Sequence, residues 1–182
     1  MTPSASPSRS PTRARGIAAD YRATGQTGVL IAERGVAIDA VISDFVSGAA
    51  EWLSPANDPA HWDLVEGQGS LFHPSYAAVT LGLIHVSQPD AMVLCHEAGR
   101  MTIGNFPDYP IPAWQDAIAT YEAAARLTNR AARVVGISIN TASLAEPDAR
   151  ALLAATATET GLPCIDPLRF GCDAIADALE RL

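Results

Sequence analysis

Two Gly-Gln turns, each between a short strand-like run and a helical pattern, constrain the fold of this chain more than any other feature. The first turn, at 23–28, follows residues 17–22, and the second, at 66–70, follows residues 62–65. A strand, a glycine-rich loop and a helix in this order form a βα unit, which predicts a parallel sheet. Parallel sheets bind ligands at the carboxyl ends of their strands. We therefore expect the two turns to lie side by side at one sheet edge and at least one of them to contact a ligand.

The rest of the chain continues the alternation. Helical patterns and continuous apolar runs predict helices at 36–53, 75–85, 114–127, 146–160 and 172–182, and strands at 62–66, 91–95, 134–139 and 164–166. The Pro/Gly-rich stretch 98–112 predicts a long functional loop. The expected fold is a three-layer α/β domain with a mostly parallel sheet over residues 16–182, after a Ser/Pro/Arg-rich tail at 1–15 that we expect to be disordered.

Composition narrows the classes of partner. A hydrophobic content of 48% with 18% charged residues indicates a packed domain. The net charge of −8 argues against nucleic acid and anionic membranes as partners, so we expect a small-molecule substrate. All 12 basic residues are arginine, which excludes a phosphate-loop lysine from this stretch of chain. Three cysteines without paired spacing favour a reduced, cytoplasmic setting.

Polar side chains at the second turn are the first candidates for chemistry. Glu66 ends a strand and precedes glycine, so it could hold Mg²⁺, act as a general base, or cap the next turn. His73 precedes Pro74 at the start of the next helix, where a histidine could shuttle a proton or cap the helix.

A second group of candidates follows the strand at 91–95. Cys95 ends an apolar run, which favours a buried, inert thiol over a nucleophile, and His96 could act beside it as a base. Arg100 could clamp a carboxylate or phosphate, because its planar fork matches both. Asn140 ends another strand and could present its amide to a nucleobase or to a polar group of the substrate.

Six segments together resemble the C-terminal domain of the D-glutamate N-acetyltransferase family: ATGQTG, DFVSGAAEWL, EGQGSLFHPSY, SQPDAMVLCHEAGR, PDYPIP and VVGISINT. The resemblance implies transfer of acetyl from acetyl-CoA to the amino group of D-glutamate. It also implies a P-loop NTPase-like fold similar to dethiobiotin synthetase, with Glu66 and Gly67 as the acidic strand-end motif. The positions carried over are Thr24, Gly25, Gln26, Thr27, Gly28, Glu66, Gly67, Gln68, Gly69, Ser70, His73, His96 and Arg100.

We expect Glu66 or His73 to act as the base. We expect the glycine turns and Asn140 to contact the cofactor, and His96 and Arg100 to contact the substrate. Members of the family are about twice as long, and a strand with a lysine-containing phosphate loop precedes the matched region. We therefore expect this chain to be incomplete as a catalyst and to form homo-oligomers or to associate with a missing N-terminal portion. The alternatives are a nucleotide-dependent ligase or kinase of the P-loop class, with Glu66 on Mg²⁺ and Asn140 at the base, and a non-catalytic fragment that needs a partner chain.

Overall fold

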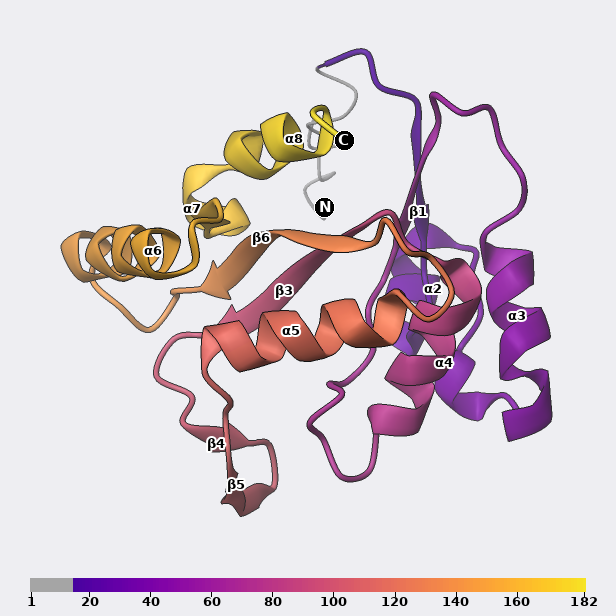
Figure 1. Cartoon of the computed structure of the whole chain (residues 1–182), viewed down its shortest axis with the longest axis horizontal. Helices are drawn as coiled ribbons and strands as arrows, with labels where there is room; N and C mark the ends of the chain where they lie inside the picture. Colours follow the sequence, from indigo (N-terminus) through magenta and orange to yellow (C-terminus); the bar gives the residue numbers. More distant parts are fainter. Residues whose placement is uncertain (1–14) are drawn as a thin grey trace, which may run out of the picture.

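The computed structural model describes residues 15–182, in which helices and strands alternate as an α/β fold (Figure 1). The strands are β1 (Ala19–Arg22), β2 (Trp62–Val65), β3 (Ala91–Glu97), β4 (Thr102–Ile103), β5 (Phe106–Pro110), β6 (Arg133–Asn140) and β7 (Cys164–Ile165). The helices are α2 (Gln26–Ala32), the 3₁₀ turns η1 (Ile38–Ala40) and η2 (Ser43–Phe45), α3 (Val46–Leu53), α4 (Ala77–Ser87), α5 (Trp114–Ala125), α6 (Glu146–Thr160), α7 (Pro167–Phe170) and α8 (Asp173–Leu179).

The strands form two parallel groups and one antiparallel hairpin. β1 pairs in parallel with β2, and β6 lies between β3 and β7 with both pairings parallel. β4 and β5 form the hairpin. The predicted mostly parallel architecture is therefore confirmed. Within residues 15–182, however, β2 pairs only with β1 and β3 pairs with β6 alone, so the parallel strands do not join into one sheet.

Helices cover both faces of β6. On one face Ile137 packs with Trp114 of α5 and Leu153 of α6. Gly136, next to it in the strand, faces the opposite side. There Ile175 of α8 approaches so closely that a Cβ on Gly136 would lie 2.8 Å from the Ile175 Cγ1 atom. Two helical layers thus enclose this part of the sheet, as the three-layer prediction required.

The helix predicted over residues 36–53 was wrong in its first half. The backbone N–H of Val36 donates to Ala23 O (3.0 Å), and that of Ile38 donates to Thr24 O (2.9 Å). Ile38 is fully buried beside the first glycine turn. Because these residues bond to the turn, the segment makes only the short turns η1 and η2, and helix α3 begins at Val46.

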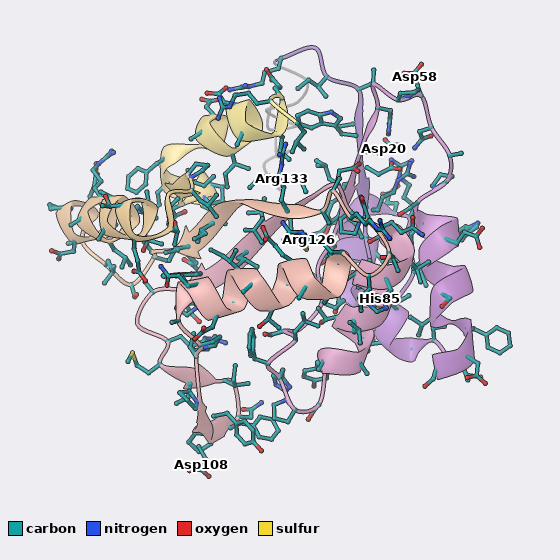
Figure 2. All side chains as sticks on the ribbon, viewed as in Figure 1. Asp20, Asp58, His85, Asp108, Arg126 and Arg133 are labelled. Carbon is teal, nitrogen blue, oxygen red and sulfur yellow. The ribbon has the colours of Figure 1, made fainter. Side chains whose placement is uncertain are left out.

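The predicted loop at 98–112 was also wrong, because it contains the hairpin β4–β5. Asn105 makes its tight turn with a φ of 65°. The hairpin projects from the body of the protein, with Asp108 at its outer end, whereas Asp20 on β1 lies at the other side of the molecule (Figure 2). The strand predicted to end at residue 95 continues to Glu97, which places Cys95 inside β3.

The chain enters the fold next to its last helix. Arg15 forms ion pairs with Asp173 (3.0 Å), Asp177 (2.6 Å) and Glu180 (3.0 Å) of the α8 region. Arg15 is the last residue of the predicted tail, and it therefore does pack against the domain. The rest of that tail lies outside the described residues. None of the helices described between residues 15 and 182 is long and apolar enough to cross a membrane.

Candidate functional site

The two Gly-Gln turns meet at the carboxyl ends of β1 and β2. Glu66 Oε2 accepts the backbone N–H groups of Thr24 (2.8 Å) and Gly25 (2.9 Å). In return, the Thr24 hydroxyl donates to Glu66 O (2.8 Å) and accepts from Gln68 Nε2 (2.9 Å). The prediction that the turns lie side by side is therefore confirmed, and the connection between them is a direct network of hydrogen bonds.

The glycines of the first turn make room for the second turn. A Cβ on Gly25 would lie 2.8 Å from Gln68 Nε2, and one on Gly28 would lie 2.8 Å from the Tyr21 hydroxyl and still closer to Glu66 Oε2. Any larger residue would displace the carboxylate. Thr24 is fully buried and offers no surface to a ligand. The protein-internal partner of this turn is thus Glu66, which holds the first turn and not, as one alternative from the sequence had it, the turn that follows it.

The carboxylate of Glu66 also influences Tyr21. Desolvation, followed by the negative charge of Glu66 and a hydrogen bond to it, raises the pKa of the Tyr21 hydroxyl above its ordinary value. The carboxylate therefore stands at the centre of a cluster of donors from β1 and the first turn.

The second turn is shaped by α4. Gly69 has a φ of 42°, in the left-handed region that favours glycine, and its Cα faces Tyr76 so closely that a Cβ would lie 2.6 Å from the Tyr76 Cβ. The Thr80 hydroxyl donates to the backbone carbonyl of Gln68. Gly67 and Gly69 are both exposed, which leaves their backbone accessible to a ligand.

A cleft of about 1850 Å³ lies between β2 and β3. Nine of the predicted site residues line it: Glu66, Gly67, Gln68, Gly69, Ser70, His73, His96, Arg100 and Asn140. The residues of the first turn, Thr24 to Gly28, are not among the lining residues. The second turn and the end of β3 thus line the same cleft, and the first turn lies behind Glu66.

Both strand edges along this cleft lack a neighbouring strand among residues 15–182. Every residue of β2 and β3 lines the cleft, together with apolar side chains that include Leu83 and Ile84 of α4 and Trp114 and Ala117 of α5. Backbone N–H and C=O groups of an unpaired strand edge are available to another strand. The cleft therefore combines the polar residues predicted from the sequence with two strand edges that are open among the described residues.

His73 stands at the mouth of the cleft within an aromatic cluster. Its ring centroid lies 4.4 Å from that of Tyr76 and 5.1 Å from that of Phe106 on the hairpin. Its Nδ1 accepts the backbone N–H of Ser75 (3.1 Å). This bond lies before α4, which begins at Ala77 without a side-chain cap, so it is a local turn contact and not the helix cap that the sequence offered as one alternative for His73.

His96 lies near the carboxyl end of β3, half-buried and edge-on to Trp114, with ring centroids 5.5 Å apart. Burial, followed by the nearby Arg100 cation, lowers the pKa of His96, while Glu97 acts in the opposite direction. Arg100 Nε donates to Glu97 Oε2 (3.0 Å), so its guanidinium already has a carboxylate partner. An incoming carboxylate would compete with Glu97 for it.

Cys95 was predicted to be buried, and this was wrong: its side chain is exposed on β3 and lines the cleft. The reason is that Cys95 follows the buried Leu94 in β3, so its side chain projects from the opposite face of the strand, which is exposed at this position. Partial desolvation of the sulfur raises the pKa of the Cys95 thiol, and its inert role stays a prediction. Asn140, at the end of β6, uses its Oδ1 to accept the N–H of Ala142 (3.0 Å), which leaves its side-chain N–H₂ group for other partners.

A buried network next to Asn140 escaped the sequence analysis. Asp166 accepts hydrogen bonds from the Thr141 hydroxyl (2.6 Å) and N–H (2.8 Å) and from the N–H groups of Leu168 (3.0 Å) and Arg169 (3.3 Å). The Arg169 guanidinium returns a bond to Thr141 O (2.8 Å). The sequence did contain a signal for part of this network, because Asp166 followed by Pro167 is typical of a helix N-cap followed by the first residue of the helix.

Comparison with known proteins places this arrangement in a family. A protein-family model described as the P-loop domain of DUF1611, a domain of unknown function, matches residues 8–176. The chain belongs to the DUF1611 family. A crystal structure of a DUF1611 family protein from Anabaena variabilis shares the fold with a TM-score of 0.88 at 44% identity, over 94% of this chain and 50% of that one. The P-loop-like fold class expected from the sequence is therefore confirmed.

Two curated relatives of this DUF1611 domain carry a functional name. A D-glutamate N-acetyltransferase of Tritonibacter scottomollicae is 48% identical over 170 residues, which is 93% of this chain and 51% of the relative. A D-glutamate N-acetyltransferase of a Pseudoalteromonas species is 50% identical over 159 residues, or 87% and 48% of the two chains. The resemblance to this family is confirmed, and the chain spans about half the length of the relatives it matches.

Proposed function

We propose that this domain is the P-loop-like part of an N-acetyltransferase that transfers the acetyl group of acetyl-CoA to the amino group of D-glutamate, giving N-acetyl-D-glutamate. The observation that carries the proposal is the identity of about half of all residues to two proteins of that name, over most of this chain. The cleft supports it, because a glycine turn, two histidines and an arginine all line it.

The chemistry of amide formation assigns roles to these groups. The exposed backbone N–H groups at Gly67 and Gly69 suit the oxyanion that develops on the acetyl carbonyl. Arg100 suits one carboxylate of glutamate, which would replace Glu97 as its partner. A base must also take a proton from the attacking nitrogen.

The open edges of β2 and β3 support the view that catalysis needs more polypeptide than residues 15–182. A parallel strand supplied by the remaining half of the family's chain would pair with both edges and fill the apolar length of the cleft. A second copy of this chain is the alternative source of partner surface. The three free cysteines support a reducing, cytoplasmic setting for this proposal.

The P-loop description of the family favours one second candidate, a nucleotide-dependent ligase or kinase. Asn140 would then contact the base through its free N–H₂ group. Glu66 would contribute only Oε1 to Mg²⁺, since Oε2 holds the first turn. Among the described residues no cluster of three or more His, Cys, Asp or Glu side chains could hold a metal, so phosphate oxygens and water would supply the other ligands.

The test is an acetylation assay with mass-spectrometric detection of the product. The chain is assayed alone and after co-expression with the unmatched half of the Pseudoalteromonas relative, with acetyl-CoA and either D- or L-glutamate. We expect N-acetyl-D-glutamate from the co-expressed form and much less from the chain alone. Failure of both forms to acetylate D-glutamate would reject the proposal, and ATP-dependent turnover instead would establish the second candidate.

A further inference from the structure

Three side chains at the cleft could take the proton from the acceptor amine: Glu66, His73 and His96. A general base must present a free lone pair to the substrate. The hydrogen bonds around these three groups differ, and the difference selects among them.

Glu66 is committed to the protein. Its Oε2 accepts two backbone N–H groups, from Thr24 (2.8 Å) and Gly25 (2.9 Å), and Tyr21 interacts with the same carboxylate. Protonation of this carboxyl group would weaken the bonds that hold the first turn to the second. Glu66 therefore positions the turns and is poorly suited to gain and lose a proton in each cycle.

His73 presents the wrong nitrogen. Its Nδ1 accepts the Ser75 N–H (3.1 Å), and a neutral imidazole that accepts at Nδ1 carries its proton on Nε2. The remaining nitrogen is therefore a donor. Tyr76 and Phe106 hold the ring in this orientation from two sides.

His96 has the required features. Neither of its ring nitrogens has a hydrogen-bond partner among residues 15–182, although the ring lines the cleft and is held edge-on by Trp114. The charged groups that face the ring are Glu97 and Arg100, which follow His96 in the chain. The side chain that contacts the ring from α5, Trp114, is uncharged. Burial and the Arg100 cation lower its pKa, so the imidazole is neutral near pH 7 and holds a lone pair ready.

We propose that His96 is the general base of the acetyl transfer, an inference that rests on the function proposed above. The amino nitrogen attacks the thioester carbonyl carbon, a C–N bond forms, and the carbonyl π electrons move to oxygen. His96 then takes the proton from the cationic nitrogen of this tetrahedral intermediate. As the oxyanion re-forms the carbonyl, the C–S bond breaks, and the proton passes to the leaving sulfur to give the free thiol of CoA.

The test uses the form of the protein that is active in the acetylation assay. For His96→Gln we expect kcat/KM to fall by about 100-fold or more, mainly through a lower kcat. A loss of this size is usual when a general base is removed. The acid limb of the pH–rate profile, with a midpoint below the ordinary histidine value of 6.5, should disappear. The matched control is His85→Gln, since His85 lies on α4, bonds Ala124 O (3.1 Å) and does not line the cleft. It should leave rate and pH profile unchanged.

The outcomes separate the two proposals. If the unmodified protein does not acetylate D-glutamate in any form, the function is rejected and this inference with it. If it does, and His96→Gln stays within threefold or keeps the acid limb, only the inference is rejected. A second measurement, nuclear magnetic resonance titration of the His96 ring, uses the unmodified chain. It therefore tests the assignment even if the His96→Gln variant fails to fold. An imidazole that is protonated at pH 7 would also overturn the assignment.

Discussion

Replacing Glu66 by glutamine perturbs the connection between the two turns with the smallest possible change in shape. The amide oxygen of glutamine can stand in for Oε2 and still accept from Thr24 and Gly25, but it carries no charge. Hydrogen bonds to charged groups contribute about 1 kcal/mol more than neutral ones, so two bonds predict a loss of about 2 kcal/mol. Glu66→Leu leaves both N–H groups without an acceptor, and we expect it to cost about 3–4 kcal/mol for that reason.

The assay is urea unfolding followed by tryptophan fluorescence, in which a change of midpoint at constant slope reports a change in stability. The matched control is Glu97→Gln, because Glu97 is also a carboxylate at a strand end but makes an exposed ion pair with Arg100. Such pairs contribute about 0–1 kcal/mol. Equal midpoints for the two glutamine variants would refute the argument that Glu66 holds the turns together.

Three further outcomes follow from the same region and from the network at β7. Absorbance titration of tyrosine should show that the pKa of Tyr21 moves back toward 10.0 in Glu66→Gln, because the negative charge beside the hydroxyl is gone. The return should be partial, because the desolvation of Tyr21 remains. Gly69→Ala should lower the free energy of unfolding by about 1–3 kcal/mol from backbone strain and overpacking. Gly67→Ala should be neutral or slightly stabilising, because a Cβ there meets no atom within 4 Å. Burial would raise the pKa of Asp166, but the hydrogen bonds it accepts hold it below 3.8. Ionised Asp166 therefore stabilises the folded state at pH values above its unfolded pKa of about 3.9, and this stabilisation is lost on further acidification. In Asp166→Asn the free energy of unfolding should consequently fall less steeply between pH 5 and 2. An acid limb as steep as in the unmodified chain would contradict this.

Local patterns predicted most elements, because helical periodicity reports which side of a helix is buried and a continuous apolar run reports a strand buried on both faces. The helix at 146–160 was predicted at its observed bounds, and the strand at 134–139 fell one residue short at each end. The errors lie where long-range bonds override local preference. Residues 36–42 have helical spacing, but Val36 and Ile38 bond to the first turn, a partner that no local pattern reveals.

The candidate site, like the fold, was predicted from the sequence only in part. The sequence identified Glu66 and His96 as strand-end residues, because a strand end is a local feature. It could not say which lone pairs remain free, since this depends on donors that are distant in the sequence. Thr24 and Gly25 lie about forty residues from Glu66, yet they occupy its carboxylate.

The sequence by itself determined the class of fold, the family, and the set of residues that could carry chemistry. These depend on residue type and on spacing along the chain, which are local quantities. Only the tertiary structure decided that the first glycine turn encloses a carboxylate of the protein. It also decided that, among residues 15–182, β2 and β3 present open edges to one cleft and the ring nitrogens of His96 have no partner there. Each of these depends on how segments far apart in the chain satisfy one another's hydrogen bonds, and a hydrogen bond is settled by position in space and not by position in sequence.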